Sequence, residues 1–231
     1  MKIALLTKHY EPHTPFGIIV KRLVEYLVGR GHKVGIILAV DFHKYLSDYD
    51  LAISYFYPHI LKEHEFNAPK YGTFNVHIGA LPYGRGAMPN VWSIVDDFPA
   101  GIAIHKMDSG IDTGDVISRA LVKKLPTDTG ETLYWRLVTE SCAFFLKSFP
   151  SIEQSLLNEG GLFGIKQVGE YLTYRARDVN RIDDLESVFG HSLAHQFVNI
   201  LRARTFAGHE SAYIYDEHGR KVFVRVSLAS E

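Results

Sequence analysis

The order of apolar segments at the start of the chain constrains its fold more than any other feature of the sequence. The run at 2–7, KIALLT, is typical of a buried strand, and the segment at 18–31, IIVKRLVEYLVGRG, has the apolar spacing of a helix. Between them, the prolines and the glycine of HYEPHTPFG at 9–17 predict a loop. HKVGIILAV at 32–40 and DLAISYF at 50–56 are two further strand candidates. Strand, helix, strand is the order of a crossover between parallel strands, so the first half is predicted to be α/β, with a mostly parallel sheet and flanking helices.

Two short strands and two helices are predicted over the next hundred residues. GTFNVH at 72–77 and GIAIHKMD at 101–108 are the strands, and a Pro/Gly-rich loop and a helix beginning near Pro89 separate them. An amphipathic helix is expected over about 130–156. Because ligands of such sheets bind at the carboxyl ends of the strands, we expect the residues that end these two strands to lie at the same edge.

The glycines of NEGGLFG predict a boundary, which divides the chain into a catalytic domain at 1–160 and a C-terminal region at 161–231. The second region is predicted to be a small α+β segment, with a helix around 190–203 and a β-hairpin centred on DEHGRK. The hairpin, near 211–226, has apolar alternation and exposed edges that need cover. We therefore expect it to pair with a second copy in a homodimer.

Composition limits the classes of partner. With 25 basic and 26 acidic residues the formal charge is −1, so no global positive field would hold a nucleic acid or an anionic membrane. No apolar run approaches the ~20 residues of a membrane span, and the apolar part of MKIALLT is too short for a secretory signal. We therefore expect a soluble, cytoplasmic protein. Its one cysteine, Cys142, lies in a segment of helical apolar spacing and is expected to be buried.

Asn75 and His77 are candidates for catalysis because they lie two residues apart on a predicted strand and so point to the same face. An amide beside an imidazole can stabilise a developing oxyanion and move a proton, as acyl transfer requires. The spacing alone does not decide this, since a hydrogen-bonded histidine at a strand end is common.

Asp112 lies in SGIDTGD, which contains the DTG tripeptide of the aspartic proteases. In that class an apolar strand carries DTG, whereas here Lys106, Asp108 and Ser109 precede it, so a protease acid is disfavoured. The flanking glycines allow a tight loop and close approach of a ligand. On these grounds Asp112 is either a turn aspartate that bonds its own backbone or a carboxylate of a site.

Other motifs fall short of a site. His191 and His195 in HSLAH have helical spacing, but Ser192 occupies the position where a zinc protease has its glutamate, so no metal site is predicted. YGRG at 83–86 lacks the spacing of a dinucleotide fingerprint, and no phosphate-binding loop of the GxxxxGK[ST] type occurs.

Taken in order, NVHIGALPYGRGAMPNVW, GIAIHKMDSGIDTGD, VISRALVKK and TDTGETLYWRL are more specific than any single motif. This order resembles the formyltransferases that use 10-formyltetrahydrofolate, most of all over about 70–140. The resemblance implies a Rossmann-like formyltransferase fold, with Asn75, His77 and Asp112 at the positions of the family's catalytic asparagine, histidine and aspartate. One departure is Gly79, where many relatives have a serine, and it is expected to affect the folate entrance.

The resemblance also implies the ligands. The backbone of the 107–113 segment would hold the pterin, and the residues implied as cofactor-binding are Lys70, Met107, Ser109, Gly110, Ile111, Asp112 and Thr113. The segment LPYGRGAMPNVW and the C-terminal region are most similar to the sugar-nucleotide N-formyltransferases, whose substrates are amino sugars on dTDP or a related carrier. Candidate substrate contacts are Lys8, His9, Tyr10, Arg85 and Asn90.

Several alternatives stay open from the sequence. The formyl acceptor could be another amine, such as a purine precursor, a hydroxylated amino acid or methionyl-tRNA. A tRNA enzyme would be expected to carry a larger, basic C-terminal barrel, whereas about 70 residues of mixed charge follow the main domain here. A hydrolase that passes the formyl group to water and a non-catalytic folate- or nucleotide-sugar-binding module are the remaining alternatives.

Overall fold

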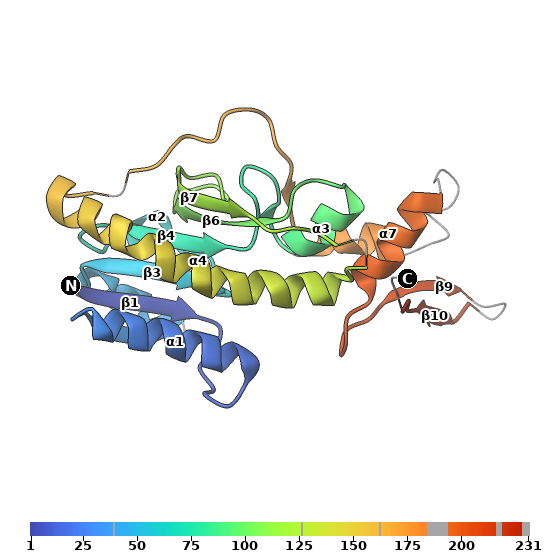
Figure 1. Cartoon of the computed structure of the whole chain (residues 1–231), viewed down its shortest axis with the longest axis horizontal. Coiled ribbons are helices and arrows are strands. Elements are labelled where there is room, and N and C mark those ends of the chain that lie inside the picture. Colours follow the sequence, from blue (N-terminus) through green and yellow to red (C-terminus); the bar gives the residue numbers. More distant parts are fainter. Residues whose placement is uncertain (39, 126, 162, 184–193, 216–218, 228–231) are drawn as a thin grey trace.

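The structure of the protein is a computed structural model, and it describes residues 1–38, 40–125, 127–161, 163–183, 194–215 and 219–227. Figure 1 shows a sheet with helices packed along it and a hairpin at the end opposite the N-terminus. The strands are β1 (Lys2–Thr7), β2 (Lys33–Ile37), β3 (Leu51–Tyr55), β4 (Thr73–His77), β5 (Arg85–Gly86), β6 (Gly101–Lys106), β7 (Val116–Leu121), β8 (Thr173–Tyr174), β9 (Ala212–Tyr215) and β10 (Lys221–Val224). The helices are α1 (Pro15–Gly29), η1 (Val40–Asp48, 3-10), α2 (Glu63–Phe66), α3 (Pro89–Val95), α4 (Gly130–Glu159), η2 (Ala176–Val179, 3-10), α5 (Asn180–Asp183) and α7 (Ala194–Arg204).

The main sheet has six strands in the order β2-β1-β3-β4-β6-β7, and β2, β1, β3 and β4 run parallel. This confirms the predicted mostly parallel α/β sheet. One expectation was wrong, because β6 runs antiparallel to β4, with Phe74 opposite Lys106 and His77 opposite Ala103. β6 therefore ends beside the start of β4. The loop that carries Asp112 leaves from this end of the strands, and Asp112 contacts Asn75 in the middle of β4.

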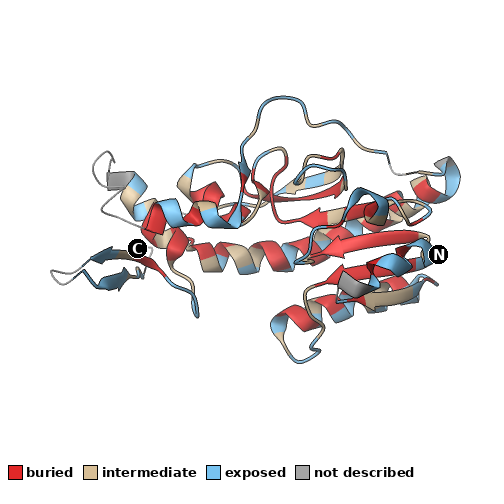
Figure 2. Cartoon of the chain, turned by 180° about the vertical axis from the view of Figure 1, so that it is seen from behind, coloured by how far each residue is buried: buried red, intermediate tan, exposed pale blue. Residues whose placement is uncertain are grey.

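Alternate residues of the strands face two different cores. Ile3 and Leu5 of β1 belong to the main core, which α1 and α4 cover, while Ala4 and Leu6 face a smaller core with Leu46 of η1 and Phe66 of α2. Figure 2 shows the buried residues concentrated in the sheet and along the inner sides of α1 and α4. Burial of one such leucine or isoleucine side chain contributes about 1.5–3 kcal/mol, so these two faces hold the sheet between its helices.

α1 begins earlier than the sequence pattern predicted. Thr14 caps it with its side-chain oxygen, which accepts a hydrogen bond from the amide of Gly17 at 3.0 Å, and Pro15 is the first helical residue. Proline suits that position because the amide that it lacks has no partner inside the helix. Pro15 and Gly17 therefore start the helix instead of breaking it.

α4 crosses the sheet and has its own cap. Cys142 lies within it and is buried, as predicted. The Thr129 side chain accepts a hydrogen bond from the amide of Thr132 at 3.1 Å.

None of the helices in the described residues is both long and apolar enough to cross a membrane.

We expect Thr129→Ala to lower the free energy of unfolding by about 1 kcal/mol, because the first amides of α4 lose their capping oxygen. Urea denaturation followed by circular dichroism measures it. Thr139→Ala, at an exposed position inside the same helix, is the matched control and should leave stability unchanged or slightly raised, since alanine is the better helix former. Equal losses in the two variants would contradict the capping role.

The C-terminal region has the predicted hairpin and, from residue 194 on, the predicted helix, while 190–193 lie outside the described residues. α7 spans Ala194–Arg204, and β9 and β10 pair antiparallel, with Lys221 opposite Tyr215 and Val224 opposite Ala212. The hairpin tip at 216–218 lies outside the described residues. Between α4 and β8 the chain at 163–172 forms an extended strap, which arches past β6 and β7 in Figure 1.

Candidate active site

A row of polar side chains crosses the sheet on the face opposite α4. Ser54 of β3 is in register with Asn75 of β4, which is in register with His105 of β6. Their neighbours Ile53, Phe74 and Ile104 belong to the main core, so strand alternation directs the polar row to the other face. His105 is a site residue that the sequence analysis missed. Its signal was its place in β6, directly after the core residue Ile104, but using that signal requires knowledge of the antiparallel register.

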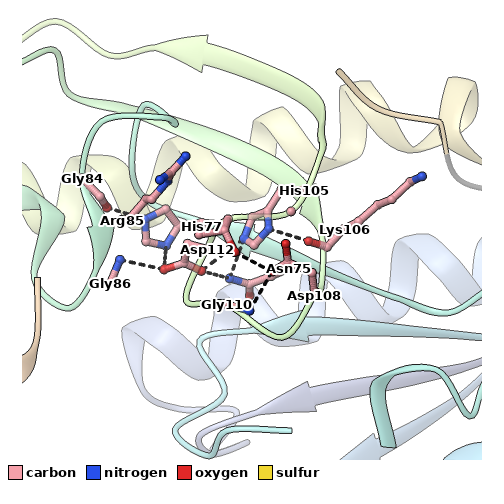
Figure 3. Close-up of polar contacts among 12 residues, drawn as sticks. Asn75, His77, Gly84, Arg85, Gly86, His105, Lys106, Asp108, Gly110 and Asp112 are labelled. Atoms are coloured by element: carbon pink, nitrogen blue, oxygen red, sulfur yellow. Dashed lines mark hydrogen bonds and ion pairs between the residues drawn. The ribbon is translucent and has the colours of Figure 1, made fainter. Parts of the chain in front are cut away.

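The Asp112 carboxylate is the centre of the site. Oδ2 accepts a hydrogen bond from the amide of Gly86 at 2.8 Å and lies 3.6 Å from Nδ1 of His77. Oδ1 lies 3.2 Å from Nε2 of His105 and accepts a longer hydrogen bond, 3.3 Å, from the Asn75 side-chain amide. Figure 3 shows the carboxylate between the two imidazoles. The structure therefore brings the three predicted catalytic residues together and adds His105 to them.

The surroundings of Asp112 favour its ionised form. Burial alone would raise the pKa of this carboxyl, but the imidazoles of His77 and His105 and the amide of Gly86 outweigh burial and hold the pKa well below its usual value. Asp112 is thus a permanent negative charge beside two imidazoles. The alternative of a turn aspartate that bonds only its own loop does not describe these contacts.

His77 is held from two sides. Its Nε2 donates a hydrogen bond to the carbonyl of Gly84 at 2.8 Å, and Nδ1 faces Asp112. Gly79 makes this possible, because a Cβ atom there would lie 2.4 Å from Nε2 of His77 and 2.8 Å from the Gly84 carbonyl oxygen. The departure at Gly79 therefore concerns the predicted catalytic histidine, His77, directly, and not only the folate entrance as expected.

Two cavities meet at His77. The loop cavity, of about 310 Å³, is lined by the 107–112 segment together with Asn75 and His105. The helix cavity, of about 540 Å³, is lined by Lys8, which follows β1, and by residues of α3, α4 and the end of α7. Both are lined by Phe56, His77, Ile78 and Gly86. One imidazole therefore faces two separate binding spaces.

The helix cavity combines aromatic walls with a cation. The Lys8 ammonium lies 4.3 Å from the ring centre of Phe16 and 3.3 Å from the Tyr134 hydroxyl, and burial lowers the pKa of Lys8. None of the ion pairs found among the described residues includes Lys8. Phe206 and His209, beyond the end of α7, complete the wall. The cavity thus suits a ligand with a planar or apolar part and a negative charge.

Three strained residues surround the cavities. Among the described residues, four non-glycine positions have positive φ, namely Phe56, Met88, Asp97 and Asp112. All but Asp97 line one of the two cavities, and Phe56 lines both. Such backbone conformations cost about 1–3 kcal/mol each and cluster at functional sites. This clustering supports a functional role for the two cavities.

The structure does not bring every predicted ligand contact to a cavity wall. Met107, Ser109, Gly110, Ile111 and Asp112 line the loop cavity, and Lys8 and Asn90 line the helix cavity.

The remaining predicted contacts lie elsewhere. Lys70 is exposed above the Tyr71 ring, Thr113 bonds Asp108, and His9 packs on Phe16, while Tyr10 packs against the main core. Arg85 is buried, and its Nε donates a hydrogen bond to the side-chain oxygen of Gln167 at 2.9 Å. These five residues line neither cavity.

No group of three metal-ligating side chains occurs among the described residues. Of the HSLAH pair, His191 lies outside the described residues, as does the side chain of His195.

Comparison with known proteins shows which family the chain resembles. Residues 41–148 match the family model for formyl transferases, and residues 193–230 match that of the N-formyltransferase dimerization C-terminal domain. The dTDP-4-amino-4,6-dideoxyglucose formyltransferase of Mycobacterium tuberculosis strain H37Rv is 36% identical over 163 residues, which are 68% of this chain. This chain spans 64% of the length of that relative.

Solved structures extend the similarity to the rest of the chain. A 4-N formyltransferase from Francisella tularensis has the same fold, with a TM-score of 0.82 at 23% identity, over 100% of this chain and 98% of that one. The formyltransferase PseJ from Anoxybacillus kamchatkensis was solved with UDP-4,6-dideoxy-4-formamido-L-AltNAc and tetrahydrofolate. It is 30% identical with a TM-score of 0.66, over 78% of this chain and 89% of that one. The chain therefore belongs to the formyl transferase family.

Proposed function

We propose that the protein transfers a formyl group from 10-formyltetrahydrofolate to the amine of a nucleotide-linked amino sugar, on dTDP or a related carrier. The observation that carries this proposal is the wall shared by the two cavities. His77 and Gly86 line both of them, and Asp112 lies within 3.6 Å of His77 on the side of the loop cavity. A donor in one cavity and an acceptor in the other would meet at the imidazole.

The loop cavity suits the formyl donor. Its wall includes the segment Met107–Ile111, in which Gly110 allows a tight turn, and a turn of this kind can let a flat heterocycle approach the backbone closely. Tetrahydrofolate is the folate named in the structure of the A. kamchatkensis relative.

The helix cavity suits the nucleotide sugar. Its aromatic walls can pack against a base or a deoxysugar, and Lys8 can pair with a phosphate. The M. tuberculosis and A. kamchatkensis relatives are named for, or were solved with, nucleotide-linked amino sugars, which supports this class of acceptor.

The chemistry follows from the charges around His77. The neutral amine attacks the formyl carbon, a carbon–nitrogen bond forms, and negative charge develops on the formyl oxygen. Asn75 and His77 would stabilise that oxyanion, with the ionised Asp112 carboxylate beside the His77 ring. The bond from the formyl carbon to the folate nitrogen then breaks, that nitrogen takes up a proton, and the amine gives one up, which leaves a formamide and tetrahydrofolate. Because only the neutral amine attacks, the rate should fall at low pH.

We expect Lys8→Met to raise KM for the nucleotide sugar about ten-fold with little change in kcat, because a charged hydrogen bond to phosphate contributes about 1.5–3 kcal/mol to binding. Steady-state kinetics with each substrate varied in turn measure this. Lys21→Met removes an exposed lysine from α1 and should change neither constant. A rise in KM for the folate instead of the sugar would place Lys8 on the donor side.

We also propose that the protein works as a homodimer. The matched dimerization domain at 193–230 includes the whole of α7 and the β9–β10 hairpin. Large apolar side chains of that hairpin, among them Ile214, Val222 and Phe223, are exposed in the single chain. A second copy that covers them would remove this exposed apolar surface from water.

The test of the function is release of tetrahydrofolate from 10-formyltetrahydrofolate in the presence of a panel of amines. The panel holds dTDP- and UDP-linked 3-amino and 4-amino deoxysugars, a purine precursor, a hydroxylated amino acid and methionyl-tRNA, and mass spectrometry follows each product. A nucleotide sugar that gains a formyl group supports the proposal and identifies the acceptor. Formylation of another amine, release without any amine, or no release at all would respectively favour a different acceptor, a hydrolase or a binding module.

A further inference from the structure

Gln167, in the strap at 163–172, binds the backbone that carries Asp112. Its side-chain amide donates one hydrogen bond to the carbonyl of Asp112 at 2.9 Å and another to the carbonyl of Gly114 at 2.8 Å. Its side-chain oxygen accepts from Nε of Arg85 at 2.9 Å. We infer that Gln167 is a positioning residue of the formyl-transfer site, which fixes the Asp112 carboxylate against His77 and His105. The inference rests on the proposed function.

These contacts close a ring around the catalytic aspartate. Gly86 donates its amide to the Asp112 carboxylate, Gln167 holds the Asp112 carbonyl, and Arg85, the residue next to Gly86, holds Gln167. Asp112 is therefore fixed at both its side chain and its backbone, and both fixings lead to the same dipeptide, β5. A shift of β5 or of the aspartate loop would have to break at least one hydrogen bond of the ring.

Only an amide side chain satisfies all three partners. Two carbonyl oxygens require two N–H donors, and the buried Arg85 guanidinium requires an acceptor, which is the donor and acceptor set of glutamine. Tyr171, which lies on the same strap as Gln167, places its ring centre 5.5 Å from the Arg85 guanidinium. A buried carbonyl or guanidinium left without its partner would cost about 1–3 kcal/mol, so the pairing is specific.

The strap is anchored on both sides of Gln167. Ile165 exchanges two backbone hydrogen bonds of 2.9 Å with Val116, and Tyr174 of β8 accepts from the amide of Ala87 at 2.8 Å, next to β5. Gly164 passes so close to Asp115 that a Cβ atom there would lie 2.8 Å from the Asp115 side chain. Gln167 is thus held in place by its own segment, and it lines neither cavity. Its effect on the reaction must pass through Asp112.

The backbone of Asp112 needs such support. Its φ is +53°, a conformation that costs free energy and persists only where surrounding contacts determine it. If the carbonyl of Asp112 loses its donor, the loop can relax toward a less strained conformation and carry the carboxylate away from the imidazoles. A displacement of about 1 Å in such a site can lower the rate about 100-fold.

The test uses the full chain with Gln167→Leu and Gln167→Glu, and Val168→Ala as the control from the exposed part of the strap. We expect Gln167→Leu to lower kcat about 100-fold while KM for both substrates stays within about three-fold, because Gln167 lines neither cavity. Glutamate is nearly isosteric and keeps the acceptor for Arg85, but it has no donors for the two carbonyls. It should therefore lower kcat as much as leucine does, whereas Val168→Ala should match the wild type.

A second readout does not depend on activity. The ring ¹H–¹⁵N resonances of His77 and His105, assigned by their loss in His77→Ala and His105→Ala, report the position of the carboxylate between the two rings. We expect both to move in Gln167→Leu and Gln167→Glu, and to stay in place in Val168→Ala. If wild-type protein formylates no amine, the proposed function fails, and the resonances still test the inference.

Two results would overturn the positioning role. Unchanged ring resonances in Gln167→Leu, or in Gln167→Glu if the leucine variant does not fold, would show that Asp112 keeps its place without Gln167. Wild-type kcat in Gln167→Glu would show that the hydrogen bonds from Gln167 to the two loop carbonyls are not needed to position Asp112.

Discussion

Asp112→Asn is expected to lower kcat for formyl transfer by about 1,000-fold, because it removes the negative charge that lies 3.6 Å from the His77 ring at the proposed oxyanion site. Asparagine is the right replacement here. Asp112 has a φ of +53°, which asparagine tolerates better than other side chains, so the loop can keep its conformation while the charge is lost. Alanine would combine loss of charge with loss of the conformational preference, and its result could not be assigned to either.

The pH dependence of this variant follows from the direction of the shift. The folded pKa of Asp112 is held below its ordinary value near 3.8, so ionised Asp112 stabilises the fold above about pH 4, and this stabilisation is lost as the pH falls through the folded pKa. Asp112 therefore keeps its charge over the whole working range. We expect the rate–pH profile of Asp112→Asn to keep the acidic limb set by the amine and to reach a lower plateau.

Asp115→Asn is the matched control, because Asp115 lies in the same loop but pairs with Lys106, at 3.8 Å, away from the imidazoles. It should retain kcat within about two-fold, as surface changes outside a site usually do. A plateau for Asp112→Asn within about ten-fold of the wild type would remove the carboxylate charge from the mechanism.

His77→Ala is expected to abolish measurable turnover while the folded protein still binds tetrahydrofolate. The imidazole lines both cavities, and its loss removes a proposed oxyanion donor, which contributes about 100-fold or more. The rest of the loop-cavity wall, including Met107–Ile111, stays intact. Calorimetric titration with tetrahydrofolate and single-turnover formyl transfer separate binding from chemistry.

His64→Ala, on the exposed surface of α2, controls for the loss of an imidazole elsewhere. The His77 variant also leaves the Gly84 carbonyl without its donor, which lowers the free energy of unfolding by about 1–3 kcal/mol, so thermal melts should accompany the kinetics. Turnover of His77→Ala within a few-fold of the wild type would exclude His77 as a catalytic group.

The sequence predicted those parts of the molecule that depend on local pattern. Apolar periodicity gave the crossover unit, α4 and the hairpin, and two-residue spacing put Asn75 and His77 on one face. The start of α1 was missed because proline and glycine were interpreted as breakers, whereas Thr14 and Pro15 form an N-terminal cap. Proline and glycine do mark a boundary of the helix there, but the boundary lies before Pro15 and not after Gly17.

The parts that could not be predicted depend on long-range pairing. His105 belongs to the site because β6 runs antiparallel to β4 and places it opposite Asn75, and no local pattern distinguishes the two directions. Gln167 lies in a strap without periodicity, and its three partners are at least 53 residues away in sequence. Such contacts depend on how distant segments pack in the tertiary structure, which no local sequence pattern specifies.

The strap and the end of α7 bear on how such a protein can be recombined. The residues proposed for the chemistry lie before position 115, but Gln167 braces Asp112, and Phe206 and His209 form part of the wall of the proposed acceptor cavity. A chimaera joined near residue 160 would therefore exchange more than an oligomerisation element. Its N-terminal part would then contact the strap and the cavity wall of another protein. An exchange of acceptor preference between relatives therefore requires that both parts come from the same protein.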